Sequence, residues 1–361
     1  MTLAEVADRL EAETADRVFA TGGQAYVSVG GEAVLDVAFG VDAIDTPVGP
    51  DSLFAVYCAG KPVFAVVVAS LVAEGELSLD DTVGDVLDRP VGDHLVGLPV
   101  SDLLDHTAGL HRLSSTVYVA SPPATREGLA LAVTPPDTWE PGHVGYSEMA
   151  SWHLLGLMAT ELTGRSPADL VRERVTGPLG LTRDLFVGGM TDDEYTAERD
   201  RIRVNAQITG LRTDPLLAER NRRLRCLPTP SIGNTASARG LGRFYEGLLA
   251  TLAGDGTAIP GVAGVLPELV APHSHGFDHA MGRTCGYGYG FMVGLPDHQF
   301  GRRVSDRAFG HSGFGGMTGA FADPTHDLVV AFHLNGRVDT ESALDLRRPA
   351  LVDGIYRAVV G

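Results

Sequence analysis

Strand-like segments lie near both ends of this chain, and a long helical stretch separates them. Alternating apolar residues around a Gly30-Gly31 turn predict a β-hairpin from segments 25–29 and 33–39. We therefore predict an α+β fold in which strands from both ends share one antiparallel sheet flanked by terminal helices. Three further strands are expected at 288–295, 317–322 and 328–334. The two terminal helices are expected at 3–18 and 341–359.

The middle of the chain has helical spacing. It is expected to form a mostly helical lobe over residues 85–229, packed over one edge of the sheet. The sheet domain is then discontinuous and comprises residues 1–84 and 230–361. Within the lobe, a charged and weakly periodic stretch near 190–226 is interpreted as an insertion or lid. Further helices are expected at 58–73, 147–162, 166–175 and 237–250.

Composition narrows the classes of function. The formal net charge is −18, and such an acidic surface repels phosphate backbones, so no nucleic-acid partner is expected. The sequence has no run of about 18 apolar residues, so no membrane span is expected. The amino-terminal segment carries charges throughout, unlike a signal peptide, which favours a cytoplasmic location. The chain has three cysteines, Cys58, Cys226 and Cys285. Their odd number and wide spacing predict neither a disulfide framework nor a metal site. The sequence has no cofactor motif.

Lysine occurs once in this chain, at position 61. The other 27 of its 28 basic residues are arginines. An arginine serves as well as a lysine where only a solvated surface cation is needed. The lysine amine, by contrast, can have its pKa lowered by burial until it acts as a base. We infer that Lys61 stands where a titratable amine is needed. The alternative is that a single lysine has survived by chance.

Cys58 and Lys61 are the first candidate pair. They are three residues apart at the start of a predicted helix, so their side chains share one face. The partial positive charge of a helix amino terminus favours a thiolate, and a desolvated lysine can take its proton or pair with it. On this spacing alone, a buried structural cysteine beside a lysine that reaches the surface is an equally good interpretation.

Two further clusters carry polar side chains beside turns. Tyr146-Ser147-Glu148 follows a Pro-Gly turn at a predicted helix start, where a tyrosine hydroxyl can shuttle a proton at a cleft edge. The segment 310–316, Gly-His-Ser-Gly-Phe-Gly-Gly, precedes a strand, and its glycines let the backbone approach a substrate. Taken singly, Tyr146 is more typical of a half-buried aromatic and His311 of a turn residue.

In this order and at these separations, the three clusters resemble the motifs of the serine β-lactamase-like superfamily, which includes class C β-lactamases, D,D-peptidases and related esterases. Residues 58–61, Cys-Ala-Gly-Lys, resemble the SxxK motif with cysteine in place of serine. Residues 146–148 are similar to the YxN element with glutamate for asparagine, and 311–313 to the KTG element in the HxG form of esterase-like members. Other family-like segments are 71–83, 103–110, 178–186, 235–244 and 321–335.

The resemblance implies a β-lactamase/transpeptidase-like fold and a covalent mechanism without a metal or organic cofactor. Cys58 takes the position that becomes acylated, Lys61 that of the adjacent base or charge partner, and Tyr146 that of the proton shuttle. The far wall of the cleft is formed by His311, Ser312 and Gly313, and the oxyanion hole by the backbone N–H groups of Cys58 and Phe314.

Two departures from the family pattern shape the expected activity. A cysteine forms a thioester, which passes its acyl group readily to an amine or thiol, so acyl transfer becomes plausible beside hydrolysis. Glu148 replaces an amide by an anion, which disfavours a substrate carboxylate at that wall. Glu148 is expected to orient Lys61, to bind a cationic substrate or to deprotonate an acceptor amine.

Three hypotheses therefore remain open from the sequence. The first is an acyltransferase that uses a small ester, amide or thioester donor, with an amine acceptor or a carrier-protein thioester as partner. The second is a conventional esterase, amidase or β-lactamase-type hydrolase, in which Cys58 is either native or an engineered replacement for serine. The third is a binding relative that has lost catalysis.

Overall fold

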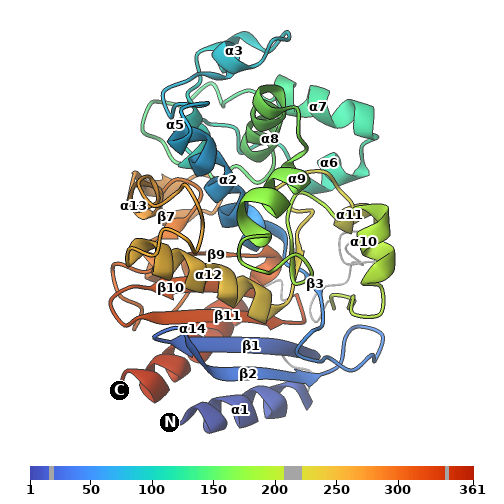
Figure 1. The fold of residues 1–361 in the computed structure, drawn as a ribbon, viewed down its shortest axis with the longest axis vertical. Helices are drawn as coiled ribbons and strands as arrows, with labels where there is room; N and C mark the ends of the chain where they lie inside the picture. The colour runs from blue at the N-terminus through green and yellow to red at the C-terminus, as the bar shows by residue number, and fades with distance from the viewer. Residues whose placement is uncertain (16–19, 207–221, 338–340) are drawn as a thin grey trace.

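The computed structural model describes residues 1–15, 20–206, 222–337 and 341–361. Its main element is an antiparallel eight-stranded sheet in the order β2-β1-β11-β10-β9-β8-β7-β6 (Figure 1). The strands are β1 (Gly22–Val29), β2 (Glu32–Gly40), β6 (Ser274–Asp278), β7 (Arg283–Tyr287), β8 (Met292–Val293), β9 (Phe309–Ser312), β10 (Thr318–Asp323) and β11 (Leu328–Leu334). A small second sheet has the order β3-β5-β4, from Phe54–Ala55, Thr235–Ala236 and Leu185–Phe186.

Strands from the two ends of the chain pair directly, as predicted. The β1 strand lies antiparallel to β11, with Gly23 opposite Leu334 and Val29 opposite Leu328. Because side chains alternate along a strand, this register places Tyr26 and Leu334 on opposite faces of the sheet. Helix α12 (Ala238–Leu252) covers the face of Tyr26, where Gly242 leaves room for the tyrosine ring.

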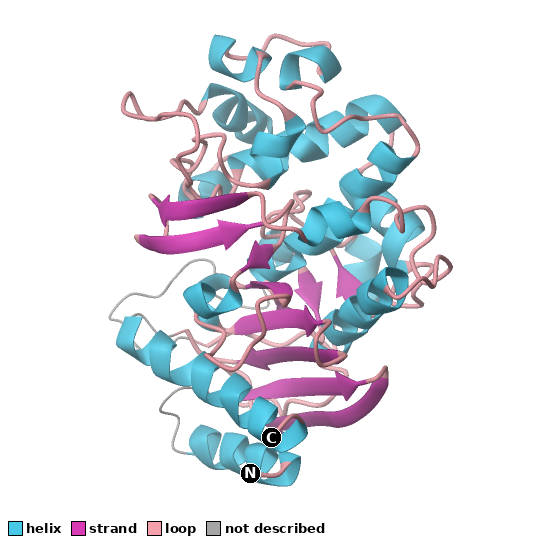
Figure 2. Cartoon of the chain, turned by 90° about the vertical axis from the view of Figure 1, so that its left-hand side faces the viewer, coloured by secondary structure: helices cyan, strands magenta, loops and turns pink. Residues whose placement is uncertain are grey.

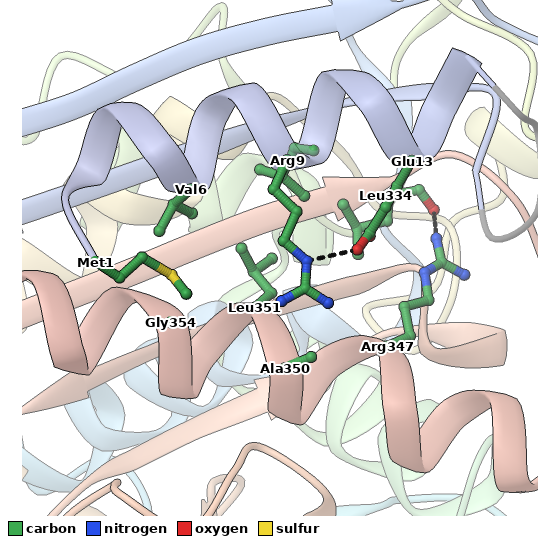
Figure 3. Close-up of a pocket in the computed structure, with 10 residues that line it drawn as sticks. Met1, Val6, Arg9, Glu13, Leu334, Arg347, Ala350, Leu351 and Gly354 are labelled. Carbon is green, nitrogen blue, oxygen red and sulfur yellow. Dashed lines mark hydrogen bonds and ion pairs between the residues drawn. The ribbon is translucent and has the colours of Figure 1, made fainter.

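The terminal helices cover the other face. Helices α1 (Leu3–Ala15) and α14 (Glu341–Val359) lie side by side, away from α12 (Figure 2). A cavity of about 250 Å³ lies between them, and Figure 3 shows the Arg9–Glu13 ion pair and Arg347, which donates to the Leu334 carbonyl, along its sides. The predicted flanking of the sheet by terminal helices is therefore confirmed, although residues 16–18 of the first predicted helix lie outside the described residues.

Helix α2 (Lys61–Ala73) connects the sheet to the helices above it (Figure 1). Residues Lys61 to Leu71 are all buried, which suits a helix that is apolar on every side and packs against α8 and β9. The other α-helices of the described residues are α3 (Val83–Val86), α4 (Asp93–Val96), α5 (Val100–Leu104), α6 (Ser115–Ala120), α7 (Pro123–Ala132), α8 (Ala150–Thr163), α9 (Pro167–Val171), α10 (Asp192–Ala197), α11 (Arg222–Arg225) and α13 (Leu266–Val270).

Several predicted elements have different bounds in the structure. The helix expected at 58–73 begins as a 3-10 turn over Tyr57–Gly60, and the one expected at 166–175 changes into a π-helical turn at Arg172–Thr176. The strand expected at 288–295 is reduced to β8, because Gly290 has a positive φ of 81° and Gly288 packs tightly against the Leu269 carbonyl. Part of the expected insertion, 207–221, lies outside the described residues.

Two features are absent from the described residues. Among the helices in this part of the chain, none is long and apolar enough to cross a membrane. In the same residues, no cluster of three or more histidine, cysteine, aspartate or glutamate side chains is arranged to hold a metal ion.

Candidate active site

Cys58 lies in the 3-10 turn that precedes α2, and the backbone before it is strained. Tyr57 has a positive φ of 50°, a conformation that is rare for residues other than glycine. The Asn234 side-chain amide donates to the Tyr57 carbonyl over 2.8 Å, and the Asn234 carbonyl accepts from the Val56 amide over 3.0 Å. Asn234 also packs so closely on Gly60 that a Cβ there would come within 2.6 Å. Asn234 thus holds the turn that presents Cys58.

Lys61 and Tyr146 are hydrogen-bonded next to Cys58. Lys61 Nζ donates to Tyr146 Oη over 2.6 Å and to the Ser147 carbonyl over 3.3 Å. Lys61 is completely buried and Tyr146 is 8% exposed. The amine also lies 4.2 Å from the centre of the Tyr146 ring. The structure therefore brings together the three residues predicted to carry out the chemistry, from the 3-10 turn, the start of α2 and the loop before α8.

Burial sets the protonation of this group. It lowers the pKa of Lys61, and the Cys58 and Glu148 charges oppose that shift. Burial also raises the pKa of Cys58, while the Lys61 charge and hydrogen bonds with Tyr146 and Lys61 lower it. The pKa of Tyr146 is raised well above its usual value by burial and then by Cys58. Burial thus opposes the predicted bias of Cys58 towards thiolate and at the same time favours the neutral form of the Lys61 amine.

Glu148 lies at the edge of the same cluster. It is half-buried, and its Oε2 accepts from the Ser115 amide over 3.2 Å. Its negative charge raises the pKa of Lys61, Cys58 and Tyr146, so the carboxylate is close enough to act on all three groups. The carboxylate favours the protonated lysine and opposes a thiolate.

His311 forms part of the opposite wall, on β9. It is 1% exposed, and its ring centre lies 5.9 Å from that of Tyr146. Its Nδ1 donates to the Ser312 carbonyl over 2.7 Å, which leaves Nε2 as a buried acceptor without a hydrogen-bond partner among the described residues. Burial, followed by the Lys61 charge, holds the pKa of His311 well below its usual value. The lysine of a KTG element would place a cation at this position, whereas His311 leaves this part of the wall neutral.

The residues after His311 bring a second backbone segment to Cys58. A Cβ on Gly313 would come within 2.5 Å of the Val56 carbonyl, so only glycine lets the end of β9 approach this closely. The Phe314 ring centre lies 5.4 Å from that of Tyr57, and Ser312 Oγ lies 3.8 Å from the Met292 sulfur. The amides of Cys58 and Phe314 stand at the amino ends of two 3-10 turns, Tyr57–Gly60 and Phe314–Gly316, where an N–H group has no acceptor within its own turn. Both amides remain able to bind an oxyanion.

Three residues of the site were not predicted from the sequence: Asn234, described above, His106 and Asp278. His106 Nδ1 accepts from the Ser147 amide over 3.1 Å, and its ring centre lies 4.7 Å from that of Tyr146. It belongs to the segment 103–110, whose only signal was its resemblance to the family. Asp278 accepts from the Tyr146 amide. It lies on β6, a strand that was not predicted, and an isolated aspartate carries no motif.

The other two cysteines differ from Cys58 in their surroundings. Burial raises the pKa of Cys226 to about 11 and that of Cys285 to about 12, and neither cysteine is hydrogen-bonded to an amine. All three cysteines are free thiols. Only Cys58 has a lysine beside it that can accept its proton.

Comparisons with known proteins bear on this arrangement. A family model described as Beta-lactamase matches residues 7–353. A penicillin-binding protein homologue from Caulobacter crescentus is 26% identical with a TM-score of 0.78, and the match covers 98% of this chain and 97% of that chain. A family VIII carboxylesterase is 23% identical, with a TM-score of 0.78 and coverage of 98% and 97%. EstCE1, described as a hydrolase with promiscuous acyltransferase activity, is 19% identical, with a TM-score of 0.72 and coverage of 97% and 98%. The last two show a shared fold. A search of curated proteins found no match.

Proposed function

The chain belongs to the β-lactamase family, as its motifs predicted, and we propose that it is an acyl-transfer enzyme that forms a covalent acyl-enzyme at Cys58. The observation that carries this proposal is the buried 2.6 Å hydrogen bond between Lys61 and Tyr146 beside the thiol. A buried amine whose pKa is lowered is a base, and a tyrosine bonded to it can pass a proton between the amine and a leaving group.

Acylation of the enzyme follows from these positions. Lys61 takes the Cys58 proton, and the sulfur forms a bond to the carbonyl carbon of the donor. The carbonyl oxygen becomes an oxyanion, which the amides of Cys58 and Phe314 stabilise. The carbon–leaving-group bond then breaks. Tyr146 gives its proton to the leaving alcohol, amine or thiol and is reprotonated by the Lys61 ammonium, so a thioester and a neutral lysine result.

Deacylation reverses the proton path. Water or an amine attacks the thioester carbon, its proton passes through Tyr146 to Lys61, and the Cys58 sulfur leaves and recovers the proton. A thioester favours amine acceptors over water more than an ester does, because amines react readily with it. Glu148 supports a cationic acceptor, since its half-buried carboxylate lies at the edge of the cluster. Transfer to an amine is therefore proposed as the principal outcome.

The same site favours an uncharged or cationic acyl donor. His311 is neutral and Glu148 carries a carboxylate, so neither of these residues offers a cation to a donor that bears a carboxylate. The Arg337 guanidinium is held over the Phe314 ring, 4.5 Å from its centre. Lys61 is engaged by Tyr146 and Ser147. We propose a small ester, amide or thioester without a carboxylate beside the reacting carbonyl.

Conventional hydrolysis is the second candidate. It is favoured by the neutral histidine wall, which matches the HxG form of the esterase-like relatives noted from the sequence. In this alternative, water is the acceptor and Glu148 serves only to tune Lys61. The two candidates share the acyl-enzyme and differ in how it breaks down.

Mass spectrometry of the intact protein during turnover of p-nitrophenyl acetate tests both steps. We expect an adduct of one acetyl group, located on Cys58 by peptide mapping and absent from Cys58→Ala. Cys226→Ser is the matched control and should acylate like the wild type, because Cys226 has no lysine beside it. If ester, amide and thioester donors all leave Cys58 unmodified, the proposal is wrong. Product partitioning between water and added 1,4-diaminobutane then separates transfer from hydrolysis.

A further inference from the structure

Asp278 is a completely buried carboxylate at the end of β6, on the edge strand of the large sheet. Its two oxygens lie 3.2 Å and 3.1 Å from the backbone nitrogen of Tyr146, whose N–H donates to the carboxylate. We propose that Asp278 is a positioning residue that holds Tyr146 in the geometry needed to exchange protons with Lys61 and Cys58. This inference rests on the proposed acylation of Cys58.

The carboxylate is itself held firmly. Tyr287 donates its hydroxyl hydrogen to Oδ2 over 2.7 Å, and the amides of Ala280 and Met281 donate to Oδ1 over 2.8 Å and 2.9 Å. With the Tyr146 amide, four donors surround one buried side chain. Hydrogen bonds of this kind to a carboxylate are strong and directional, so Asp278 has a single orientation in this site.

Asp278 also joins the backbone of β6 to the loop that carries Tyr146. Val144 and Asp278 form an isolated parallel bridge, and the His279 amide donates to the Val144 carbonyl over 2.9 Å. The loop from Val144 to Tyr146 therefore runs along the end of β6 as a short added strand. This arrangement sets the direction in which the Tyr146 side chain leaves the backbone.

A second contact acts on the Tyr146 ring. The Tyr287 ring is stacked on it, with centres 6.1 Å apart and planes inclined by 23°. The His106 ring lies 4.7 Å from both tyrosine rings, and its Nδ1 accepts from the Ser147 amide. Asp278 therefore acts at two points, on the Tyr146 amide directly and on the Tyr146 ring through Tyr287.

Accurate placement of Tyr146 matters because its hydrogen bond contributes to the ionisation of Cys58. The hydrogen bond with Tyr146 lowers the thiol pKa against the effect of burial, together with the Lys61 charge. The charged and titratable groups around the thiol are Lys61, Tyr146 and Glu148. His106, His311 and Tyr287 face Tyr146. A displacement of Tyr146 by about 1 Å is expected to slow acylation about 100-fold.

Asp278→Asn is the informative substitution. An asparagine keeps the shape and one acceptor oxygen, but its NH₂ group then faces donors in a buried site. If its oxygen takes the place of Oδ1 and accepts from Ala280 and Met281, it keeps only the 3.2 Å contact with the Tyr146 nitrogen, and the NH₂ group replaces the acceptor at 3.1 Å with a donor that opposes the Tyr146 N–H. The anchor of the tyrosine loop is then weakened, while the sheet and the aromatic rings keep their volume.

The chain offers a matched control in Asp323, at the end of β10 in the same sheet. It is also completely buried, and it accepts from the Tyr356 hydroxyl over 2.5 Å and from the Thr325 amide over 3.0 Å. It is bonded to Ser305 as well, and none of its hydrogen bonds in the described residues involves Cys58, Lys61 or Tyr146. Asp323→Asn therefore disturbs a similar buried carboxylate away from the thiol.

The experiment compares the two variants by the acetylation rate of Cys58 with p-nitrophenyl acetate, and by the pH dependence of its alkylation by iodoacetamide, both mapped by mass spectrometry. We expect both variants to lose stability. Asp278→Asn should in addition acylate about 10- to 100-fold more slowly. Its alkylation profile should move to higher pH, because the Tyr146 hydrogen bond that lowers the thiol pKa is weakened. Asp323→Asn should acylate within about twofold of the wild type.

The inference is wrong if folded Asp278→Asn keeps the wild-type rate and profile, or if Asp323→Asn loses as much activity. If Asp278→Asn does not fold, Tyr287→Phe takes its place. Tyr287→Phe keeps the stacked ring and removes one of the four donors, and it should slow acylation about 3- to 10-fold; an unchanged rate would overturn the inference. A wild-type protein that is never acylated at Cys58 instead refutes the proposed function.

Discussion

Lys61 Nζ and Tyr146 Oη are 2.6 Å apart in a site that excludes solvent from both groups. The only lysine of the chain is therefore placed where its charge is costly and its neutral form is favoured. An arginine would remain charged at this position at any ordinary pH. The proposed role of Lys61 as a base accounts for the use of lysine here, in a chain that uses arginine for its other 27 basic residues.

Replacing Lys61 by methionine should abolish most of the acylation, because the buried base is removed while the volume of the side chain is retained. We expect the rate of Cys58 acetylation to fall about 100- to 10,000-fold, the range attributed to a general base. Lys61→Arg should not restore it, since a guanidinium cannot accept the proton. Stopped-flow release of p-nitrophenol measures the rate. A Lys61→Arg variant with wild-type activity would show that only the charge is needed.

The reactivity of Cys58 towards iodoacetamide should rise with pH into the alkaline range. Burial raises the thiol pKa, so the thiol form dominates at neutral pH and alkylation follows the growing thiolate fraction. In Lys61→Met the profile should move to still higher pH, because the Lys61 charge lowers the thiol pKa. Peptide mapping of alkylation at several pH values measures both profiles. A shift of the Lys61→Met profile to lower pH would contradict this account.

Sequence patterns predicted the fold where the local spacing and the tertiary structure agree. The β1–β2 hairpin, β10 and β11 were foreseen because the Gly30-Gly31 turn marks the hairpin and because β10 and β11, which are buried on both faces, are largely continuous apolar runs. Helix α14 has the bounds that were predicted for it. Strands β6, β7 and β9 were not foreseen. They are short, and the pairs His275-Gly276 and Gly310-His311 lack the alternation of a half-buried strand. Neighbouring strands, rather than their own sequence, determine their conformation.

The candidate site could be predicted only as far as its motifs extend. Cys58, Lys61 and Tyr146 stand in spaced motifs, and the structure brings them together. Asp278, His106 and Asn234 reach the site through hydrogen bonds with backbone groups that are distant in sequence, and such bonds leave no spacing pattern. The raised thiol pKa was also not foreseen, because burial of Cys58 is a property of the packed structure.

Glu148→Gln should weaken the preference for cationic acceptors. The glutamate charge lies at the edge of the cluster, and its removal takes away an attraction of about 1 kcal/mol for a partly exposed pair. We expect the transfer ratio of 1,4-diaminobutane to 4-aminobutanol to fall about fivefold, because only the diamine keeps a second cation. Product analysis at a fixed acyl donor concentration measures this ratio. An unchanged ratio would mean that Glu148 acts only on the protonation of Lys61 and does not bind the acceptor.

Gly313→Ala should impair acylation more than it impairs binding of the donor. A Cβ at Gly313 would lie 2.5 Å from the Val56 carbonyl, so the end of β9 and the Phe314 amide must move away from Cys58. Losing one oxyanion donor costs about 100- to 1,000-fold in kcat.

Gly128→Ala in α7 is the control for Gly313→Ala. It meets no atom within 4 Å and should stabilise the helix by about 0.5–1 kcal/mol without changing kcat. Equal kcat values for the two variants would exclude the Phe314 amide as a donor.

Acid should destabilise the protein through its buried histidines. Burial lowers the pKa of His298 to about 4, and those of His106, His311 and His333 lie well below the usual value of 6.5. The unfolded chain therefore binds more protons than the folded one below about pH 6.5. Each of these groups should remove about 1.4 kcal/mol of stability per pH unit as the pH falls from there towards its folded pKa. Urea unfolding at pH 7.5, 6.0 and 5.5 measures the slope of the unfolding free energy against pH.

His298→Gln tests the contribution of one of these histidines. The glutamine keeps a donor for the Gly286 carbonyl, which His298 contacts over 2.8 Å. The variant should lose the contribution of one histidine to the slope, so its stability should fall less steeply as the pH falls. A wild-type slope in that variant would mean that His298 is protonated in the folded protein, against the effect of its burial.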